Sequence, residues 1–335
     1  MPLPDNHRQP PLVSIVALAF SAATTIIESL DSFAAQTYSR LELILCDDGS
    51  TDTTVALAEE WIAKRGARFE RVEFVRHPTN VGIVRNHAGG LARCRGKWIK
   101  SIACDDLLAP AAIATFVERA QATGAEWLMA QCRRFAQHDG QREDLGDLID
   151  SASAALLAQA DSAKLREAML HGNFVPAPGV FCARAMLEEC GGLDLRFHHL
   201  DDWPLWIRLL EMGRVPEWIA LPLISYRITA DTASQRTARM AVPPLLFADE
   251  LRFTTLYLRY RLPRWSYWHV RVHQWRKKVV LRHLGNKASA LRWTAPALLL
   301  SPIAWTRIAS RFRASKDRKN VDRRRDSATH NPPHP

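Results

Sequence analysis

A short apolar segment that stops on two carboxylates constrains this fold more than any other feature of the sequence. The segment is LELILCDDGSTDTT, Leu41 to Thr54. Its first six residues are typical of a strand buried on both faces of a parallel sheet. Gly49 can take a positive φ, and the polar residues after it are good N-caps for the helical pattern that follows. Ligands of open α/β sheets bind beyond the carboxyl ends of strands, so we expect Asp47 and Asp48 to border a ligand crevice. The alternative is a turn with two solvated aspartates.

Strand-like and helix-like patterns alternate over the first 230 residues. Strands are expected at 12–20, 41–46, 71–76, 97–104 and 126–132, with short strand-like pieces at 215–228. Helices are expected from Ser21 to about 34, then at 54–65, 83–94, 110–122 and 151–170, and from about His198. Residues 135–150 are polar and turn-like, and 172–179 form a loop rich in glycine and proline. This alternation predicts an α/β fold with a doubly wound, mainly parallel sheet and helices on both faces.

The net charge of +10 is unevenly distributed along the 335 residues. From Leu251 onward there are 20 Lys and Arg against 3 Asp and Glu, a net charge of +17, so the first 250 residues carry −7. The basic part also holds five tryptophans, at 265, 268, 275, 293 and 305. A run of like charges after about residue 315 predicts a disordered tail.

The six cysteines form no CxxC pair and no Cys/His metal spacing, which predicts reduced, cytosolic thiols. The first twelve residues contain no apolar signal region, and no run of about 20 apolar residues occurs in the chain. We therefore expect neither export nor a membrane-spanning helix.

A second strand-like run, KWIKSIAC, also ends on a carboxylate pair, Asp105 and Asp106. Hard carboxylate oxygens suit Mg²⁺ or Mn²⁺, which neutralises a diphosphate, and the first pair can accept hydrogen bonds from a base or sugar. No Gly-rich phosphate loop is present. The combination indicates a nucleotide-diphosphate donor with a metal as Lewis acid. Three structural readings stay open: Asp106 as a helix cap, Arg85 in a surface ion pair, and Asp202 as a solvated helix residue.

An ordered set of motifs resembles family 2 glycosyltransferases with the GT-A fold, over about residues 12–230. The motifs are QTYSRLELILCDDGSTD (36–52), NVGIVRN (80–86), RGKWIKSIACDDLLAP (95–110), GGLD (191–194) and DDWPLWIRL (201–209). The resemblance implies inverting transfer of a sugar from a nucleotide-diphosphate sugar, usually a UDP-sugar. Three positions depart from the family pattern: Ala103 replaces the first Asp of DxD, Leu18–Ser21 replaces Pro-x-Tyr-Asn, and Thr229 replaces a His.

The same resemblance implies the roles of individual residues. Asp202 falls on the general base, with Asp201 in place of the usual Glu. The residues implied in binding are Asp47, Asp48, Arg85 and Asp105 for the nucleotide sugar, with Asp47 on the base, and Asp105 and Asp106 for Mg²⁺ or Mn²⁺.

The implied organisation is a GT-A domain over residues 1–235 and a basic, Trp-rich helical extension over 236–335. The nucleotide-binding half spans about 12–132 and the acceptor half about 133–235. We expect a glycan or lipid-linked acceptor, peripheral contact of the extension with an anionic membrane, no nucleic acid, and a place at the inner face of the cytoplasmic membrane. The rival readings are a nucleotidyltransferase acting on sugar phosphates, a non-enzymatic basic adaptor for RNA or membrane, and an inactive relative.

Overall fold

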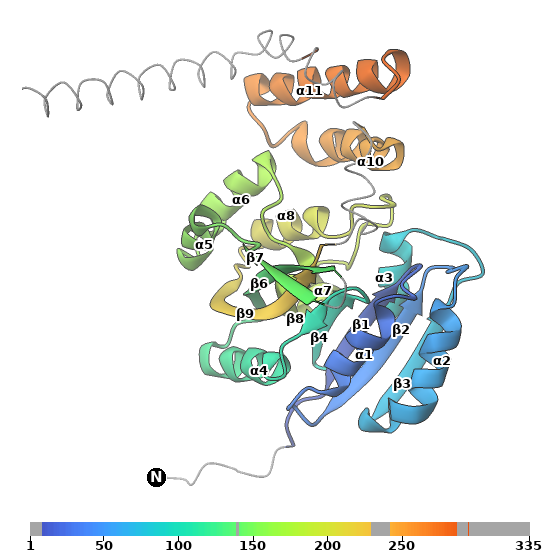
Figure 1. Ribbon diagram of the computed structural model, residues 1–335. Helices are drawn as coiled ribbons and strands as arrows, with labels where there is room; N and C mark the ends of the chain where they lie inside the picture. Colours follow the sequence, from blue (N-terminus) through green and yellow to red (C-terminus); the bar gives the residue numbers. More distant parts are fainter. Residues whose placement is uncertain (1–8, 139–140, 229–241, 287–293, 295–335) are drawn as a thin grey trace, which may run out of the picture. The chain divides into compact units, whose positions relative to one another are not determined.

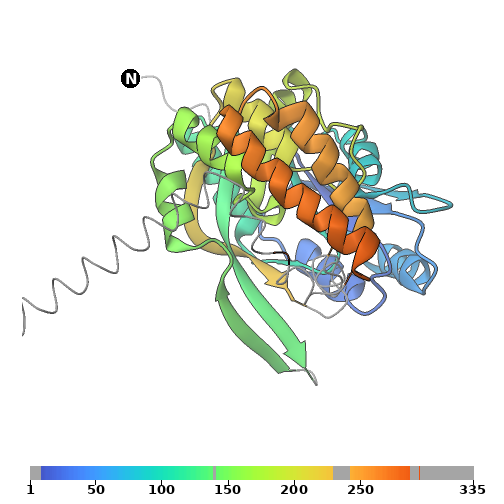
Figure 2. The same ribbon diagram turned by 90° about the horizontal axis from the view of Figure 1, so that it is seen from above.

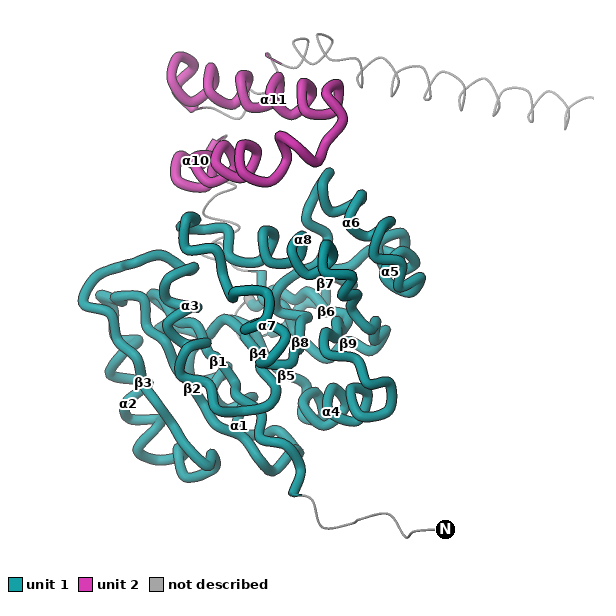
Figure 3. Tube along the Cα trace, turned by 180° about the vertical axis from the view of Figure 1, so that it is seen from behind, with its two compact units in different colours: residues 1–236 teal, residues 237–335 magenta. Residues whose placement is uncertain are grey.

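The computed structural model describes residues 9–138, 141–228, 242–286 and 294. The chain divides into two compact units, residues 1–236 and 237–335, shown in two colours in Figure 3. Thr229 and the tail after residue 315 lie outside the described residues, as do Trp293 and Trp305.

Nine strands of the first unit's described residues form one sheet. They are β1 (Val13–Ala19), β2 (Leu41–Asp47), β3 (Arg71–Arg76), β4 (Trp98–Ala103), β5 (Leu107–Leu108), β6 (Trp127–His138), β7 (Gln141–Asp147), β8 (Val180–Ala183) and β9 (Glu217–Arg227). Their order is β3-β2-β1-β4-β8-β6-β9-β5, with β7 beside β6. β1 to β4 are parallel to one another, and β6 is parallel to β9. The expected mainly parallel sheet is confirmed, whereas the alternation of patterns did not predict the antiparallel strands β5, β7 and β8.

Helices cover both faces of this sheet, as expected (Figure 1). They are α1 (Ile26–Ala34), α2 (Thr54–Arg65), α3 (Ile83–Leu91), α4 (Ala112–Thr123), α5 (Ser151–Ala158), α6 (Ser162–His171), α7 (Arg184–Glu189) and α8 (Trp203–Glu211). The chain moves outward from β1 to β3 and then returns past β1 to β4. Because such crossovers are right-handed, α1 and α2 lie on one face and α3 lies on the other. Gly90 of α3 approaches Val16 and Cys46 so closely that a Cβ there would lie 2.7 Å and 2.8 Å from their side chains.

Four expected boundaries are wrong. Residues 135–150 are not turn-like, because β6 and β7 form a hairpin that extends away from the rest of the sheet (Figure 2). The strand-like pieces at 215–228 are one strand, β9, whose pairing with β6 shifts register around Pro222. The helix at 151–170 is two helices, separated where Ala160 takes a φ of 50°.

The fourth correction concerns where two helices begin. The first starts at Ile26 rather than Ser21, which takes a φ of 50° just after β1. The helix expected from His198 starts at Trp203, with Asp202 as its N-cap and a proline in its first turn. Asp201 therefore precedes α8 instead of lying on it.

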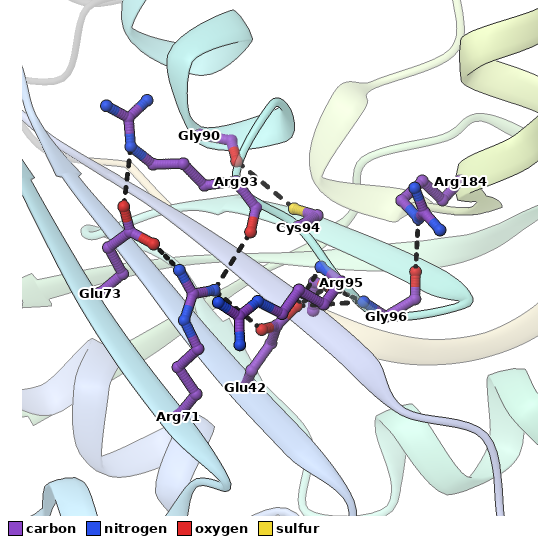
Figure 4. Close-up of polar contacts among 10 residues, drawn as sticks. Glu42, Arg71, Glu73, Gly90, Arg93, Cys94, Arg95, Gly96 and Arg184 are labelled. Carbon is purple, nitrogen blue, oxygen red and sulfur yellow. Dashed lines mark hydrogen bonds and ion pairs between the residues drawn. The ribbon is translucent and has the colours of Figure 1, made fainter.

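A buried glutamate, Glu42, connects the amino ends of the parallel strands through hydrogen bonds and an ion pair (Figure 4). Glu42 of β2 accepts hydrogen bonds from Ser14 Oγ at 2.5 Å, Arg95 N at 2.6 Å and Gly96 N at 3.1 Å. It also pairs with Arg71 Nη1 at 3.1 Å. These contacts join β1, β2, β3 and the turn before β4 at the end of the sheet opposite the aspartate pairs.

The second unit contains α10 (Pro244–Phe253), a π-helical turn η3 (Thr254–Leu258) and α11 (Arg264–His283). Gln274 of α11 donates to Thr254 Oγ1 at 2.6 Å and to Glu250 O at 3.2 Å. None of the helices in the described residues is long and apolar enough to cross a bilayer. All six cysteines lie within the described residues, and none of them is in a disulfide.

Candidate active site

Asp47 is the last residue of β2, and its carboxylate closes the turn that follows. One oxygen accepts from Gly49 N at 3.1 Å and Ser50 N at 2.9 Å, and the other accepts from Ser50 Oγ. Gly49 takes the expected positive φ, 75°, and a Cβ there would lie 2.5 Å from the backbone of Thr79. Asp47 is only 1% exposed, so its described contacts serve the turn, and its role toward a nucleotide base stays a prediction.

Asp48 connects this turn to the start of α3. Its Oδ1 accepts from Val81 N at 2.7 Å, which holds the loop before the helix. Burial raises the pKa of Asp48, while the backbone N–H groups of Val81 and Gly82 oppose that rise. Arg85 follows in the first turn of α3 and is exposed, and in the described part of the chain its side chain has no hydrogen-bond or ion-pair partner. A cation so placed is available to a phosphate.

Asp105 and Asp106 follow β4, on the same edge of the sheet as Asp47, because β1 pairs with both β2 and β4. Asp105 is half-buried, whereas Asp106 is 1% exposed. Asp106 Oδ1 accepts from Arg227 N at 2.9 Å, and Arg227 Nε donates to Asp105 O at 2.8 Å. Burial, followed by the charge of Asp105, raises the pKa of Asp106.

The two aspartates differ in how well they fit a divalent cation. Mg²⁺ and Mn²⁺ are commonly held by one or two carboxylates together with substrate phosphates. Asp105 fits this pattern, because its half-buried carboxylate lies at the edge where the donor is expected. Asp106 fits it less well, since one oxygen is already engaged by Arg227 and the group is buried. No cluster of three or more His, Cys, Asp or Glu suited to a metal occurs within the described residues.

Asp201 and Asp202 lie side by side at the amino end of α8. Asp202 Oδ1 accepts from Trp203 N at 2.6 Å, and Oδ2 accepts from Asn173 Nδ2 at 2.8 Å. Asp201 Oδ2 lies 3.0 Å from His87 Nδ1. Burial, with the like charge of Asp201 as the next cause, raises the pKa of Asp202 to about 7.

The segment before α8 lies beside α3, which brings this carboxylate pair toward the nucleotide-side candidates. His198 O accepts from Val84 N at 3.4 Å, and a Cβ on Gly82 would lie 2.5 Å from the His198 ring. Sequence reasoning missed His87, Asn173 and Arg227 as members of this region. Of these three, only Arg227 lies close to a position that the family resemblance had singled out, two residues before Thr229.

Comparison with known proteins finds similar glycosyltransferases. Residues 14–173 match the model of glycosyl transferase family 2. A chondroitin synthase from Escherichia coli is 29% identical over 204 residues, which cover 61% of this chain and 27% of that protein. The chain spans between 27% and 63% of the length of the first three curated relatives that it matches.

Two solved structures share the fold. TarS 1–349 of S. aureus in complex with UDP-GlcNAc has a TM-score of 0.54 at 12% identity, covering 80% of this chain and 72% of that one. The mannosyltransferase PcManGT from Pyrobaculum calidifontis, in complex with GDP-Man and Mn²⁺, has a TM-score of 0.53 at 16% identity, covering 93% and 81%. The fold of this chain is therefore that of GT-A glycosyltransferases.

Proposed function

We propose that this chain, whose residues 14–173 match the model of glycosyl transferase family 2, transfers a sugar from a nucleotide-diphosphate sugar, with UDP as the nucleotide. The acceptor is a hydroxyl of a glycan or of a lipid-linked glycan. The observation that carries this proposal is the pair of adjacent carboxylates at α8, in which Asp202 is held by Trp203 N and Asn173. A carboxylate fixed in this way, with a pKa near neutrality, is suited to general base catalysis.

In the proposed reaction Asp202 takes the proton of the acceptor hydroxyl while the hydroxyl oxygen attacks the anomeric carbon. The bond from that carbon to the diphosphate breaks at the same time, and the configuration inverts. Asp105 would hold Mg²⁺ or Mn²⁺, and the bound ion would supply a Lewis acid for the diphosphate leaving group. Arg85 contributes a further positive charge from the first turn of α3. Asp47 and Asp48 hold the loops that border the nucleotide.

The names of similar proteins support the class of donor and product. TarS and PcManGT were solved with UDP-GlcNAc and with GDP-Man and Mn²⁺, respectively, and a relative is named chondroitin synthase. We therefore infer a divalent cation as cofactor and a polysaccharide or glycolipid as product. The proposed glycosyltransferase activity replaces the alternative of a nucleotidyltransferase, and it requires no nucleic-acid partner.

Contact with an anionic membrane through the second unit is part of the proposal. α11 carries no Asp or Glu, and its exposed residues follow helical spacing as one stripe: Arg264, Trp265, Trp268, Arg271, Trp275, Lys278, Arg282 and His283. Indole rings settle at membrane interfaces, and basic residues are attracted to anionic lipid. The enzyme would then work at the inner face of the cytoplasmic membrane, where lipid-linked acceptors are found.

The proposed function is tested by a screen of nucleotide sugars with and without Mn²⁺, followed by the Asp202→Asn variant on the active donor. Asp202→Asn keeps the shape of the side chain but removes the base, so transfer should fall at least about a hundredfold while nucleotide binding is nearly unchanged. Asp201→Asn is the matched control and should cost less. Wild-type transfer rates in both variants would remove Asp202 from its role. Loss in Asp201→Asn alone would move the base to Asp201.

A further inference from the structure

His87 lies between the carboxylate pair and the central sheet. It is in α3, and its Nδ1 is 3.0 Å from Asp201 Oδ2 while its Nε2 is 2.7 Å from Ser101 Oγ of β4. Its side chain is 10% exposed, and that of Asp201 is 14% exposed. The contact joins residues 114 positions apart in the sequence.

Both ring nitrogens are satisfied when the imidazole is neutral with its proton on Nδ1. In that tautomer Nδ1–H donates to Asp201, and Nε2 accepts from the hydroxyl of Ser101. The opposite neutral tautomer would place two acceptors, Nδ1 and the carboxylate, against each other. The arrangement therefore selects one tautomer and gives Asp201 a fixed donor.

Asp201 and Asp202 compete for the role of base unless something distinguishes them. Trp203 N and Asn173 Nδ2 hold Asp202, whereas the Nδ1–H of His87 in α3 holds Asp201, so each carboxylate is kept in place by its own donors. We propose, on the basis of the proposed function, that His87 is a positioning residue that binds Asp201 and thereby leaves Asp202 as the base. Asp201 then stays bound to α3 through His87, and Asp202 remains the N-cap of α8.

Among the described residues that line the cavity beside His87, no other group could take this role. A cavity of about 30 Å³ borders His87, Ser101, Asp201 and Asp202. Its remaining lining, from α3, β4, η2 (Ala177–Gly179), β8, α7, α8 and the segment before α8, is apolar apart from the Cys182 thiol. Burial raises the pKa of Cys182 to about 12, so this thiol is neutral across the working range.

The helix that presents His87 is itself fastened near the candidate donor site. Its first residues follow the loop held by Asp48, and Asn86 Nδ2 donates to Cys46 O of β2 at 3.1 Å. A residue on such an anchored element is held more closely than one on a free loop. The position of the base is thus tied to the strands that carry the nucleotide-side aspartates.

The test compares three variants in transfer assays at saturating and at low donor concentration. His87→Leu removes the donor to Asp201, His87→Asn keeps an N–H at the position of Nδ1, and Ser101→Ala leaves the His87–Asp201 contact in place. We expect His87→Leu to lower kcat at least about tenfold with little change in donor KM. His87→Asn and Ser101→Ala should stay within about threefold of wild type. Equal loss in His87→Leu and His87→Asn, or a loss confined to donor KM, contradicts the proposal.

A second measurement does not depend on turnover. The ¹⁵N chemical shifts of the His87 ring at pH 8 should report the Nδ1–H tautomer in wild type and its loss in Asp201→Ala. The Nε2–H tautomer in wild type would overturn the proposed contact. If wild type transfers no sugar from any donor, the proposed function fails, and this spectrum still decides the pairing of His87 with Asp201.

Discussion

The two donors that hold Asp202 act in the same direction on its ionisation. Each hydrogen bond favours the carboxylate and so opposes burial and the charge of Asp201, which still leave the pKa of Asp202 raised to about 7. Because the base must be ionised, transfer should rise with pH up to about 7 and then level off. The pKa of this residue therefore sets the lower pH limit of the proposed enzyme.

Removing the hydrogen bond from Asn173 predicts the direction in which this lower pH limit moves. In Asn173→Ala the carboxylate loses a stabilising hydrogen bond, so its pKa rises and the acid limb of kcat/KM moves to higher pH. The plateau rate well above the limb should stay close to wild type and serves as the internal control. An acid limb that moves to lower pH, or does not move, contradicts the assignment of Asp202 as the base.

Asp105 and Asp106 can be separated by calorimetry of UDP with and without Mn²⁺. Asp105→Ala should remove most of the increase in affinity that Mn²⁺ provides. Asp106→Asn retains an oxygen for Arg227 N and should keep that increase. Equal loss in both variants would make Asp106 a metal ligand.

Asp47→Ala should weaken UDP binding by the same factor with and without Mn²⁺, because Asp47 acts by holding the turn of Gly49 and Ser50.

At the scale of elements, the ends of the strands could be predicted because the residues that mark each end are neighbours in the sequence. Apolar runs that stop on Asp47 and Asp105 determine where the carboxylates lie along the edge of the sheet. The contacts of Arg227 could not be predicted in this way, since it pairs with Glu28, 199 positions earlier. His87 and Asp201 are likewise joined only once α3 and the segment before α8 are packed. Such pairings depend on β8, which lies antiparallel between β4 and β6, and on β9, which lies between β6 and β5. No periodic pattern in the sequence predicts these two positions.

The Glu42 cluster at the amino ends of the strands gives a prediction about stability (Figure 4). Glu42→Gln leaves the donors of Arg95, Gly96 and Arg71 without their carboxylate in a buried site. The free energy of unfolding should fall by about 1–3 kcal/mol. Glu73 pairs with Arg71 and Arg93 near the surface, so Glu73→Gln should cost less than about 1 kcal/mol. Urea denaturation of both variants measures the difference, and equal costs would contradict a structural role for Glu42.

At the scale of the whole molecule, charge separates the two parts of the chain. The first 250 residues carry −7 and the rest +17, so attraction to an anionic surface belongs to the second part. The exposed fractions of Trp265, Trp268 and Trp275 are 53%, 55% and 54%, although such rings are usually covered in soluble domains. This combination is the basis of the proposed contact between α11 and an anionic lipid surface.

Flotation with anionic vesicles tests the α11 stripe. Replacing Arg271, Lys278 and Arg282 by Gln should weaken binding about a hundredfold, since each basic residue near the surface contributes about 1 kcal/mol. Replacing the three exposed tryptophans by Ser should weaken binding further at high salt, where the charges are screened. Unchanged flotation in both variants contradicts the membrane proposal. Tighter binding to single-stranded RNA than to vesicles would support the adaptor reading instead.

The position of β9 between β6 and β5 has a consequence for synthesis of the chain on the ribosome. Domains fold in large part as they emerge, from the N-terminus onward. β1 to β4 can pair once residue 103 is released, but β5 must wait for Ser225 and Ile224 of β9. Until then the edge of β6 that β9 will cover is open to other chains. The turn of Asp105 and Asp106 also lacks Arg227 for the time needed to add more than a hundred residues. The candidate metal site is thus among the last parts of the first unit to form, after the nucleotide-side strands are already in place.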